Sequence, residues 1–212
     1  MGYTIRKQTC ADGQVYRYHV SDQAGHLRYV AEPVGRLLPL PTRLVEFFDP
    51  DQNPVGRILP PEVAPWQRGE RYEIFTGSGS EDGERQAPRA VIWERWRLVD
   101  VLLLHLPRYE VQLGAYHYIV EGSRYGERFY EIFRLCGEDE GEKARGLDEE
   151  RAERQEADED EEEPKPKQVK VGQIQRPTAG PSYIVETSVA PLRQAPLVLT
   201  ALAILIDMDL HA

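Results

Sequence analysis

Short stretches in which apolar and polar residues alternate run along most of this chain, separated by turn-forming residues. Such alternation is typical of β-strands with one face buried. The turns are rich in glycine, proline, aspartate and asparagine, as at 22–25 and 49–54. No amphipathic helical segment stands between these stretches, so the pattern predicts an antiparallel sheet. The expected strands are 3–7, 15–20, 26–31, 43–48, 55–59, 71–75, 108–113, 117–121, 128–135, 168–175 and 182–187.

Residues 90–106 are apolar but show no clean alternation, and their pattern fits a buried strand or a short helix equally well. The hairpin strand at 15–20 is clearer. There Tyr16, Tyr18 and Val20 are expected to face inward, and Val15, Arg17 and His19 are expected to face outward.

The last apolar segment, residues 195–206, is predicted to be a helix that begins near Pro196 and runs to about residue 210. Its large aliphatic side chains cover most of the helix circumference, so nearly all of its sides must be buried. The uncharged run of twelve residues gives about 18 Å of helix, against about 30 Å for the hydrocarbon core of a bilayer. Asp207 follows it directly. These features favour a helix in a protein core over a transmembrane span.

The negative charge of the chain is concentrated in one tract. Residues 137–163 hold 15 acidic and 4 basic side chains, a net charge of −11, whereas the whole chain carries −10. Low hydrophobicity and like charges predict that residues 137–167 form a disordered acidic insertion. Because strands are expected on both sides of it, residues 1–212 are predicted to form a single domain. The tract is also a candidate site for a basic protein partner.

About ten or more short strands followed by one wholly apolar helix resemble the tubby C-terminal-like superfamily, in particular phospholipid-scramblase-like and LURP-one-related proteins. The resemblance rests on strand–turn–strand units at 20–30 and 48–58, on 171–176, and on the terminal segment 199–207. It implies a mainly β fold, a closed antiparallel barrel of about twelve strands that encloses the C-terminal helix. A barrel of this kind is physically reasonable, because closing a sheet removes its edges and leaves an interior that an apolar helix can fill.

The sequence contains no recognisable catalytic motif and no set of histidines or cysteines at metal-ligand spacing. In the region where scramblases carry an acidic calcium-binding segment, Glu186 is the only carboxylate, which is too few ligands for Ca²⁺. We therefore expect no enzyme activity, cofactor or metal. The one concentration of basic and aromatic residues, Arg95, Arg97 and Arg108 with Trp93 and Trp96, is a candidate ligand-binding site. The alternative is a ladder of arginines on the outer face of a barrel.

The N-terminus lacks an apolar signal segment, and Cys10 and Cys136 are too few for a disulfide framework. These observations predict a cytoplasmic protein, with peripheral contact to the membrane if lipid is its ligand. The leading hypothesis is a non-enzymatic binding or scaffold module whose ligand, by the resemblance, is an anionic phospholipid headgroup. Nucleic acid is not expected as a partner. The alternatives are a scramblase-type membrane protein, in which the terminal helix would insert into lipid, and an adaptor that recruits basic partners through the acidic tract.

Overall fold

The computed structural model describes residues 2–9, 16–34, 44–60, 71–77, 87–95, 107–123, 129–136, 167–177 and 182–211. These residues form twelve strands and two helices. The strands are β1 (Gly2–Thr9), β2 (Tyr16–Asp22), β3 (Leu27–Pro33), β4 (Val45–Phe48), β5 (Pro54–Leu59), β6 (Arg71–Thr76), β7 (Ala90–Arg95), β8 (Arg108–Leu113), β9 (Tyr116–Ser123), β10 (Phe129–Cys136), β11 (Lys167–Gln175) and β12 (Ser182–Thr187). The helices are α3 (Ala190–Arg193) and α4 (Pro196–His211).

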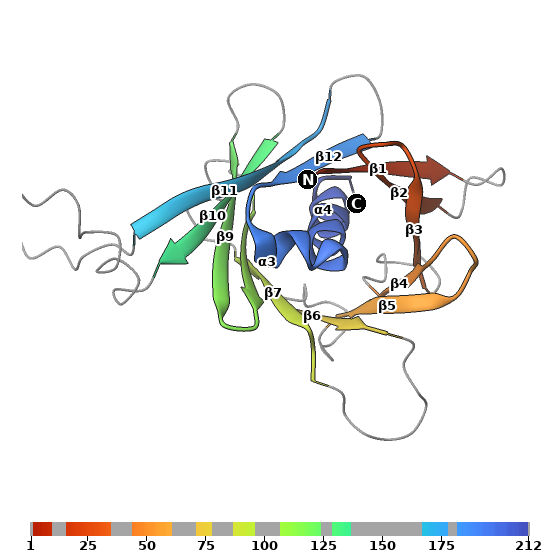
Figure 1. The fold of residues 1–212 in the computed structure, drawn as a ribbon, viewed down its shortest axis with the longest axis horizontal. Helices are drawn as coiled ribbons and strands as arrows, with labels where there is room; N and C mark the ends of the chain where they lie inside the picture. Colours follow the sequence, from red (N-terminus) through yellow and green to blue (C-terminus); the bar gives the residue numbers. More distant parts are fainter. Residues whose placement is uncertain are drawn as a thin grey trace, which may run out of the picture.

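The twelve strands form one closed antiparallel barrel in which each strand pairs with its neighbours in sequence. Pairing of β1 with β12 closes it, with Ile5 opposite Tyr183. The barrel winds around α4, which lies inside the ring of strands (Figure 1). The predicted fold class is thereby confirmed, and every predicted strand is found with its ends shifted by two residues or fewer. The ambiguous region 90–106 begins with β7, and its residues 96–106 lie outside the described part of the chain.

Strand alternation decides which side chains enter the barrel. On β2, Tyr18 and Val20 are 1% and 0% exposed, while Arg17 and His19 between them face outward, as predicted. The register carries this alternation from strand to strand, because residues directly opposite each other share a face. The interior is consequently lined by aliphatic and aromatic side chains, among them Ile5, Val20, Phe47, Ile58, Tyr72, Ile74, Ile92, Tyr109, Val111, Tyr130, Ile132 and Ile174.

Helix α4 is buried on every side, as its composition predicts. Its small or polar arc is as inaccessible as its aliphatic residues, since Thr200 and Ala203 are 0% exposed and Asp207 is 2% exposed. The Thr200 hydroxyl is satisfied within the helix, because it donates a hydrogen bond of 2.9 Å to the carbonyl oxygen of Pro196. Asp207, in contrast, finds its partners on the surrounding strands.

Two glycines allow the strands to approach their surroundings closely. A Cβ atom at Gly56 on β5 would lie 2.6 Å from the carbonyl oxygen of Phe75 and 3.0 Å from Cδ1 of Leu197 on α4. A Cβ atom at Gly172 on β11 would lie 2.5 Å from the carbonyl oxygen of Glu186. Both positions therefore need glycine for space rather than for backbone conformation.

The acidic tract connects two neighbouring strands. β10 ends at Cys136 and β11 begins at Lys167, and these two residues are paired in the sheet. The strands before and after the tract thus belong to the same barrel. Residues 137–166 lie outside the described part of the chain, and so does the prediction that they are disordered.

Candidate functional site

A buried carboxylate anchors the C-terminal half of α4 to the barrel wall. Asp207 accepts hydrogen bonds at Oδ2 from Lys7 Nζ (2.9 Å) and from the Tyr18 hydroxyl (2.8 Å). Its Oδ1 accepts a third from the Tyr183 hydroxyl (3.0 Å). The three donors come from β1, β2 and β12, the strands on both sides of the closure. A buried charge without such partners would be costly, so this interior cluster ties the helix to the seam of the barrel.

The same cluster keeps its tyrosines protonated. Burial, followed by the negative charge of Asp207, raises the pKa of Tyr18 far above its usual value of 10.0. Burial and the same carboxylate also raise the pKa of Tyr16. Lys7 Nζ lies 4.2 Å from the ring centroid of Tyr16, where its charge is attracted by the π-face. The interior cluster thus pairs one buried carboxylate with a lysine and with two neutral tyrosine hydroxyls.

A second carboxylate points into the barrel from β7. Glu94 is 2% exposed, and its Oε2 accepts a hydrogen bond of 3.2 Å from the hydroxyl of Tyr72 on β6. It stands opposite Tyr109 in the register of β7 and β8. Glu94 and Tyr72 thus form a second hydrogen-bonded polar pair among the buried residues.

The structure brings together two of the three arginines predicted as a ligand-binding site. Arg95 and Arg108 are direct partners in the register of β7 and β8, while Arg97 lies outside the described residues. Arg95 Nε lies 3.4 Å from Glu110 Oε2, and Arg108 Nη1 lies 3.2 Å from Glu121 Oε1. Each guanidinium therefore already faces a carboxylate. This arrangement favours the arginine-ladder interpretation of these residues.

Similar ion pairs occur elsewhere on the outer wall. They join Arg71 Nη2 to Glu73 Oε1 at 2.7 Å and Lys170 Nζ to Glu131 Oε1 at 2.6 Å. Such exposed pairs contribute about 0–1 kcal/mol each, so they affect surface charge more than stability. The outer wall is therefore close to neutral where these ion pairs lie.

On the outer face of β1 and β2, the positive charges are less completely paired with carboxylates. Arg6 is exposed, stands directly opposite His19, and has no carboxylate partner among the described residues. Arg17 shares this face, and its Nε lies 3.5 Å from Oε1 of Glu32. Burial, followed by the charges of Arg17 and Arg6, lowers the pKa of His19. We call Arg6, Arg17 and His19 the basic face.

Sequence reasoning missed the basic face because its residues are spread over two strands. One pattern in the sequence does point to this face. If 3–7 and 15–20 form the two strands of a hairpin, their alternation puts Arg6, Arg17 and His19 on the outer surface of adjacent strands. Only the register, however, places Arg6 opposite His19.

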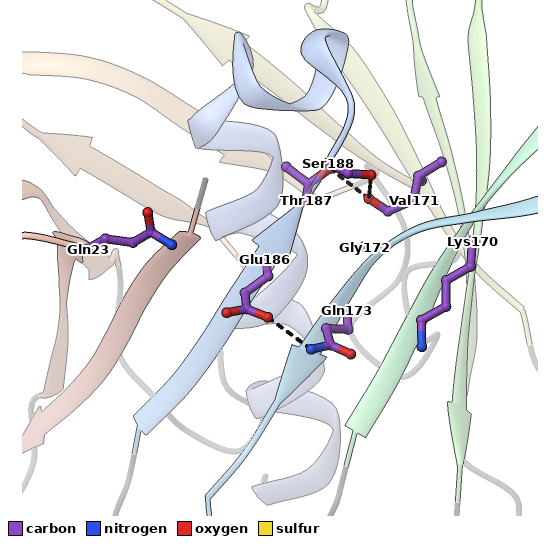
Figure 2. A pocket seen from close by; sticks show the side chains of 8 residues that line it. All are labelled: Gln23, Lys170, Val171, Gly172, Gln173, Glu186, Thr187 and Ser188. Carbon is purple, nitrogen blue, oxygen red and sulfur yellow. Dashed lines mark hydrogen bonds between the residues drawn. The ribbon is translucent and has the colours of Figure 1, made fainter.

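A groove of about 460 Å³ lies on the outer surface where β12 leaves β11 (Figure 2). The Val171 carbonyl oxygen accepts three hydrogen bonds here: from the backbone N–H of Ser188 (2.9 Å), from Thr187 Oγ1 (3.0 Å) and from Ser188 Oγ (3.1 Å). Across the groove, Gln173 Nε2 donates a hydrogen bond of 2.9 Å to Glu186 Oε2. The lining residues are Gln23, Lys170, Val171, Gly172, Gln173, Glu186, Thr187 and Ser188.

Within the described ranges, no three histidine, cysteine or acidic side chains converge as metal ligands would. His19 belongs to the basic face, His26 lies beside Asp22 in the exposed turn before β3, and His117 is exposed on β9. Cys136 is unpaired at the end of β10. Cys10 and His105 lie outside the described residues.

Comparison of this chain with protein-family models, with curated proteins and with solved structures finds no match. Among the helices described, none has the length and apolar character needed to cross a bilayer.

Proposed function

We propose that this barrel is a non-enzymatic binding module that recognises anionic phosphate headgroups, of the kind found in phospholipids, through the basic face formed by Arg6, Arg17 and His19. The observation that carries the proposal is the exposed Arg6 guanidinium, which has no carboxylate opposite it in the described part of the chain. The resemblance to tubby-like domains supplies the ligand class.

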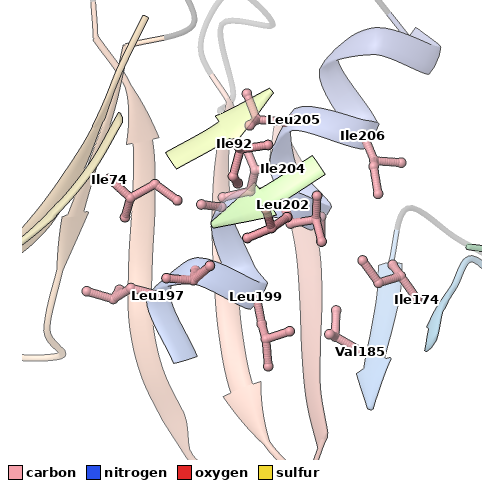
Figure 3. Packing of buried hydrophobic residues seen from close by; sticks show 14 of the residues in the cluster. Ile74, Ile92, Ile174, Val185, Leu197, Leu199, Leu202, Ile204, Leu205 and Ile206 are labelled. Atoms are coloured by element: carbon pink, nitrogen blue, oxygen red, sulfur yellow. The ribbon is translucent and has the colours of Figure 1, made fainter. Parts of the chain in front are cut away.

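The filled interior supports binding on the outside of the barrel. Side chains of α4 such as Leu202 and Ile204 meet the inward residues of the wall, including Ile74, Ile92 and Val185 (Figure 3). All five are 2% exposed or less. The described interior is thus occupied by side chains of α4 and of the strands, whereas the outer wall offers charged side chains to solvent.

Charge balance distinguishes the basic face from Arg95 and Arg108. An anion that approaches Arg95 or Arg108 must compete with Glu110 or Glu121. At the basic face it meets Arg6 without such competition, and Arg17 is 41% exposed at its side chain. A planar guanidinium binds phosphate oxygens in a bidentate manner, so one or two unneutralised arginines are enough for a peripheral contact.

Co-sedimentation with vesicles tests the proposal. Wild-type protein is expected to bind vesicles that contain phosphatidylglycerol, to ignore vesicles of phosphatidylcholine alone, and to dissociate as salt is added. Basic residues near a membrane surface contribute about 1 kcal/mol each, so the double variant Arg6→Gln/Arg17→Gln should bind about tenfold or more weakly.

The matched control is Arg95→Gln/Arg108→Gln, which removes the same charge from the opposite part of the wall and should leave binding unchanged. Loss of binding in the control variant, or no binding by the wild type, would refute the assignment to the basic face. Salt-resistant binding would instead mean that α4 leaves the barrel and inserts, as a scramblase-type protein requires.

A further inference from the structure

The outer surface at the closure of the barrel presents hydrogen-bond donors on three adjacent strands. β12, β1 and β2 follow one another around the closure. On β1, Arg6 stands opposite Ser182 of β12 on one side and opposite His19 of β2 on the other. Residues directly opposite each other share a face of a sheet, so the three side chains lie side by side on the outer wall. We call Arg6, His19 and Ser182 the seam row.

The inner side of the same strand segments holds α4. Lys7, Tyr18 and Tyr183 are the chain neighbours of the seam row, and all three donate hydrogen bonds to Asp207 inside the barrel. Alternation along each strand then points the seam row outward. The backbone that carries the seam row is thus fixed from within on three consecutive strands. A rigid support of this kind lowers the ordering cost of binding a ligand.

The seam row offers donors, and its neighbours supply no free carboxylate. Arg6 is exposed, and the Ser182 hydroxyl has no hydrogen-bond partner among the described residues. Glu32, which pairs with Arg17, lies one strand further away on β3. The next outward positions along the three strands are not acidic: they are Thr4, Gln8, Arg17, Ser21 and Ile184. An anion bound here therefore meets donors without a competing carboxylate.

The spacing of the seam row fits one phosphate group. Neighbouring strands lie about 4.8 Å apart, so the backbones at His19 and Ser182 are separated by about 10 Å. A phosphate placed above Arg6 can accept hydrogen bonds of about 2.8 Å from a side chain on either side. A phosphate monoester has three terminal oxygens and a charge of about −1.5 to −2 at pH 7, whereas a phosphodiester has two terminal oxygens and a single charge. Three donors on three strands therefore match the monoester.

We propose that the seam row binds a phosphate monoester across the closure of the barrel, with Arg6 in the centre, His19 on one side and the Ser182 hydroxyl on the other. This inference rests on the proposed binding of phosphate headgroups at the basic face. It narrows the ligand from anionic headgroups in general to those that end in a phosphate. Ser182 distinguishes the monoester from the diester, because its hydroxyl is the donor for the third oxygen.

Co-sedimentation of the full-length protein with vesicles of matched surface charge tests this proposal. One set of phosphatidylcholine vesicles contains phosphatidic acid, whose headgroup is a phosphate monoester. The other contains phosphatidylglycerol, whose headgroup is a diester, at a fraction that gives the same zeta potential. The protein should bind the phosphatidic acid vesicles about tenfold more tightly, since one further hydrogen bond to a charged group contributes at least about that factor.

Three variants assign the preference to Ser182. Ser182→Ala should abolish the preference for phosphatidic acid while changing binding to phosphatidylglycerol by about twofold or less. Ser182→Thr keeps the hydroxyl and should keep the preference. The matched control is Ser21→Ala, which removes a half-buried hydroxyl from β2 opposite Thr4 and should leave the preference unchanged. Thermal unfolding of each variant checks that the barrel is intact.

Soluble glycerol 3-phosphate distinguishes a lipid from a free phosphate ester as the source of the monoester. If the source is a lipid, glycerol 3-phosphate should release the protein from phosphatidic acid vesicles only at concentrations well above that of the lipid phosphate. Release at an equal concentration would identify a free ester as the ligand. Either result supports a monoester site at the seam row, provided that Ser182→Ala weakens the binding.

Equal binding to the two kinds of vesicle would overturn this proposal and leave headgroup binding at the basic face standing. A preference for phosphatidic acid that survives Ser182→Ala, or that Ser21→Ala removes to the same extent, would overturn it as well. Binding to neither kind of vesicle would refute both the monoester site and the proposed function.

Discussion

Lys7 and Asp207 lie 200 positions apart in the chain, yet Lys7 Nζ and Asp207 Oδ2 are only 2.9 Å apart in the folded protein. One residue belongs to the first strand and the other to the last helix. The Lys7 side chain is 23% exposed and that of Asp207 is 3% exposed, so the pair runs from the rim of the barrel to its interior. The contact holds α4 inside the barrel at the seam where the first and last strands meet.

Removing the carboxylate should cost a large part of the stability of the fold. We expect Asp207→Ala to lower the free energy of unfolding by about 3–5 kcal/mol, because it leaves Lys7 and two buried tyrosine hydroxyls without their acceptor. Urea unfolding measures the loss. Asp51→Ala, in the exposed turn between β4 and β5, is the control and should change stability by about 0.5 kcal/mol or less. A similar small effect for Asp207→Ala would contradict the role assigned to this residue.

The energy of the Lys7–Asp207 pair itself can be separated by a double-mutant cycle. In Asp207→Asn the amide oxygen still accepts from tyrosine while the charge is lost. A cycle of Asp207→Asn with Lys7→Met should give a coupling free energy of about 1–3 kcal/mol. The outer pair Arg71–Glu73 has a similar distance of 2.7 Å but is exposed, and its cycle should give about 1 kcal/mol or less. Equal couplings for the two pairs would mean that burial adds nothing to the inner one.

Alkaline pH should destabilise the protein through its buried tyrosines. The pKa of Tyr18 is raised in the folded state, so above about pH 10 the unfolded chain loses a proton that the folded chain keeps. Stability should fall with rising pH there, by up to about 1.4 kcal/mol per pH unit for each such tyrosine. Tyr18→Phe should make the decline shallower in urea unfolding between about pH 8 and 11. An unchanged slope would show that Tyr18 ionises as readily when folded.

Headgroup binding should strengthen as pH falls. The pKa of His19 lies below its usual value of 6.5, which leaves the ring neutral at pH 7. A bound phosphodiester would favour the protonated ring, so binding should take up a proton. Affinity for phosphatidylglycerol vesicles should therefore rise from about pH 7 to 5, and His19→Gln should flatten this rise. A pH profile that is the same with and without the imidazole would exclude His19 from the contact.

The outline of the fold could be predicted from sequence because it rests on local patterns. Alternation marks the strands, and a short segment that is apolar all round, such as 195–206, favours a helix enclosed by protein. The partner of Asp207 could not be predicted. The sequence shows an aspartate at the end of an apolar run, and only closure of the barrel brings Lys7, Tyr18 and Tyr183 to it.

The pairing of the surface arginines could not be predicted from the sequence either. Arg95 and Arg108 stand out in sequence because tryptophans lie near them, but the register supplies each with a carboxylate from the next strand. Arg6 stands out less, and the register places it opposite His19, with no carboxylate partner among the residues that the structure describes. Which cations are neutralised thus depends on residues far away in sequence, and an aromatic–basic cluster does not by itself show it.

Amide NMR of the full-length protein, titrated with short-chain phosphatidylglycerol below its micelle concentration, tests the central claim most directly. Chemical-shift changes should be concentrated at Arg6, Arg17 and His19 on β1 and β2, while the amide shifts of β7, β8 and α4 should not change. Changes centred on Arg95 and Arg108, changes throughout α4, or none at all would contradict it.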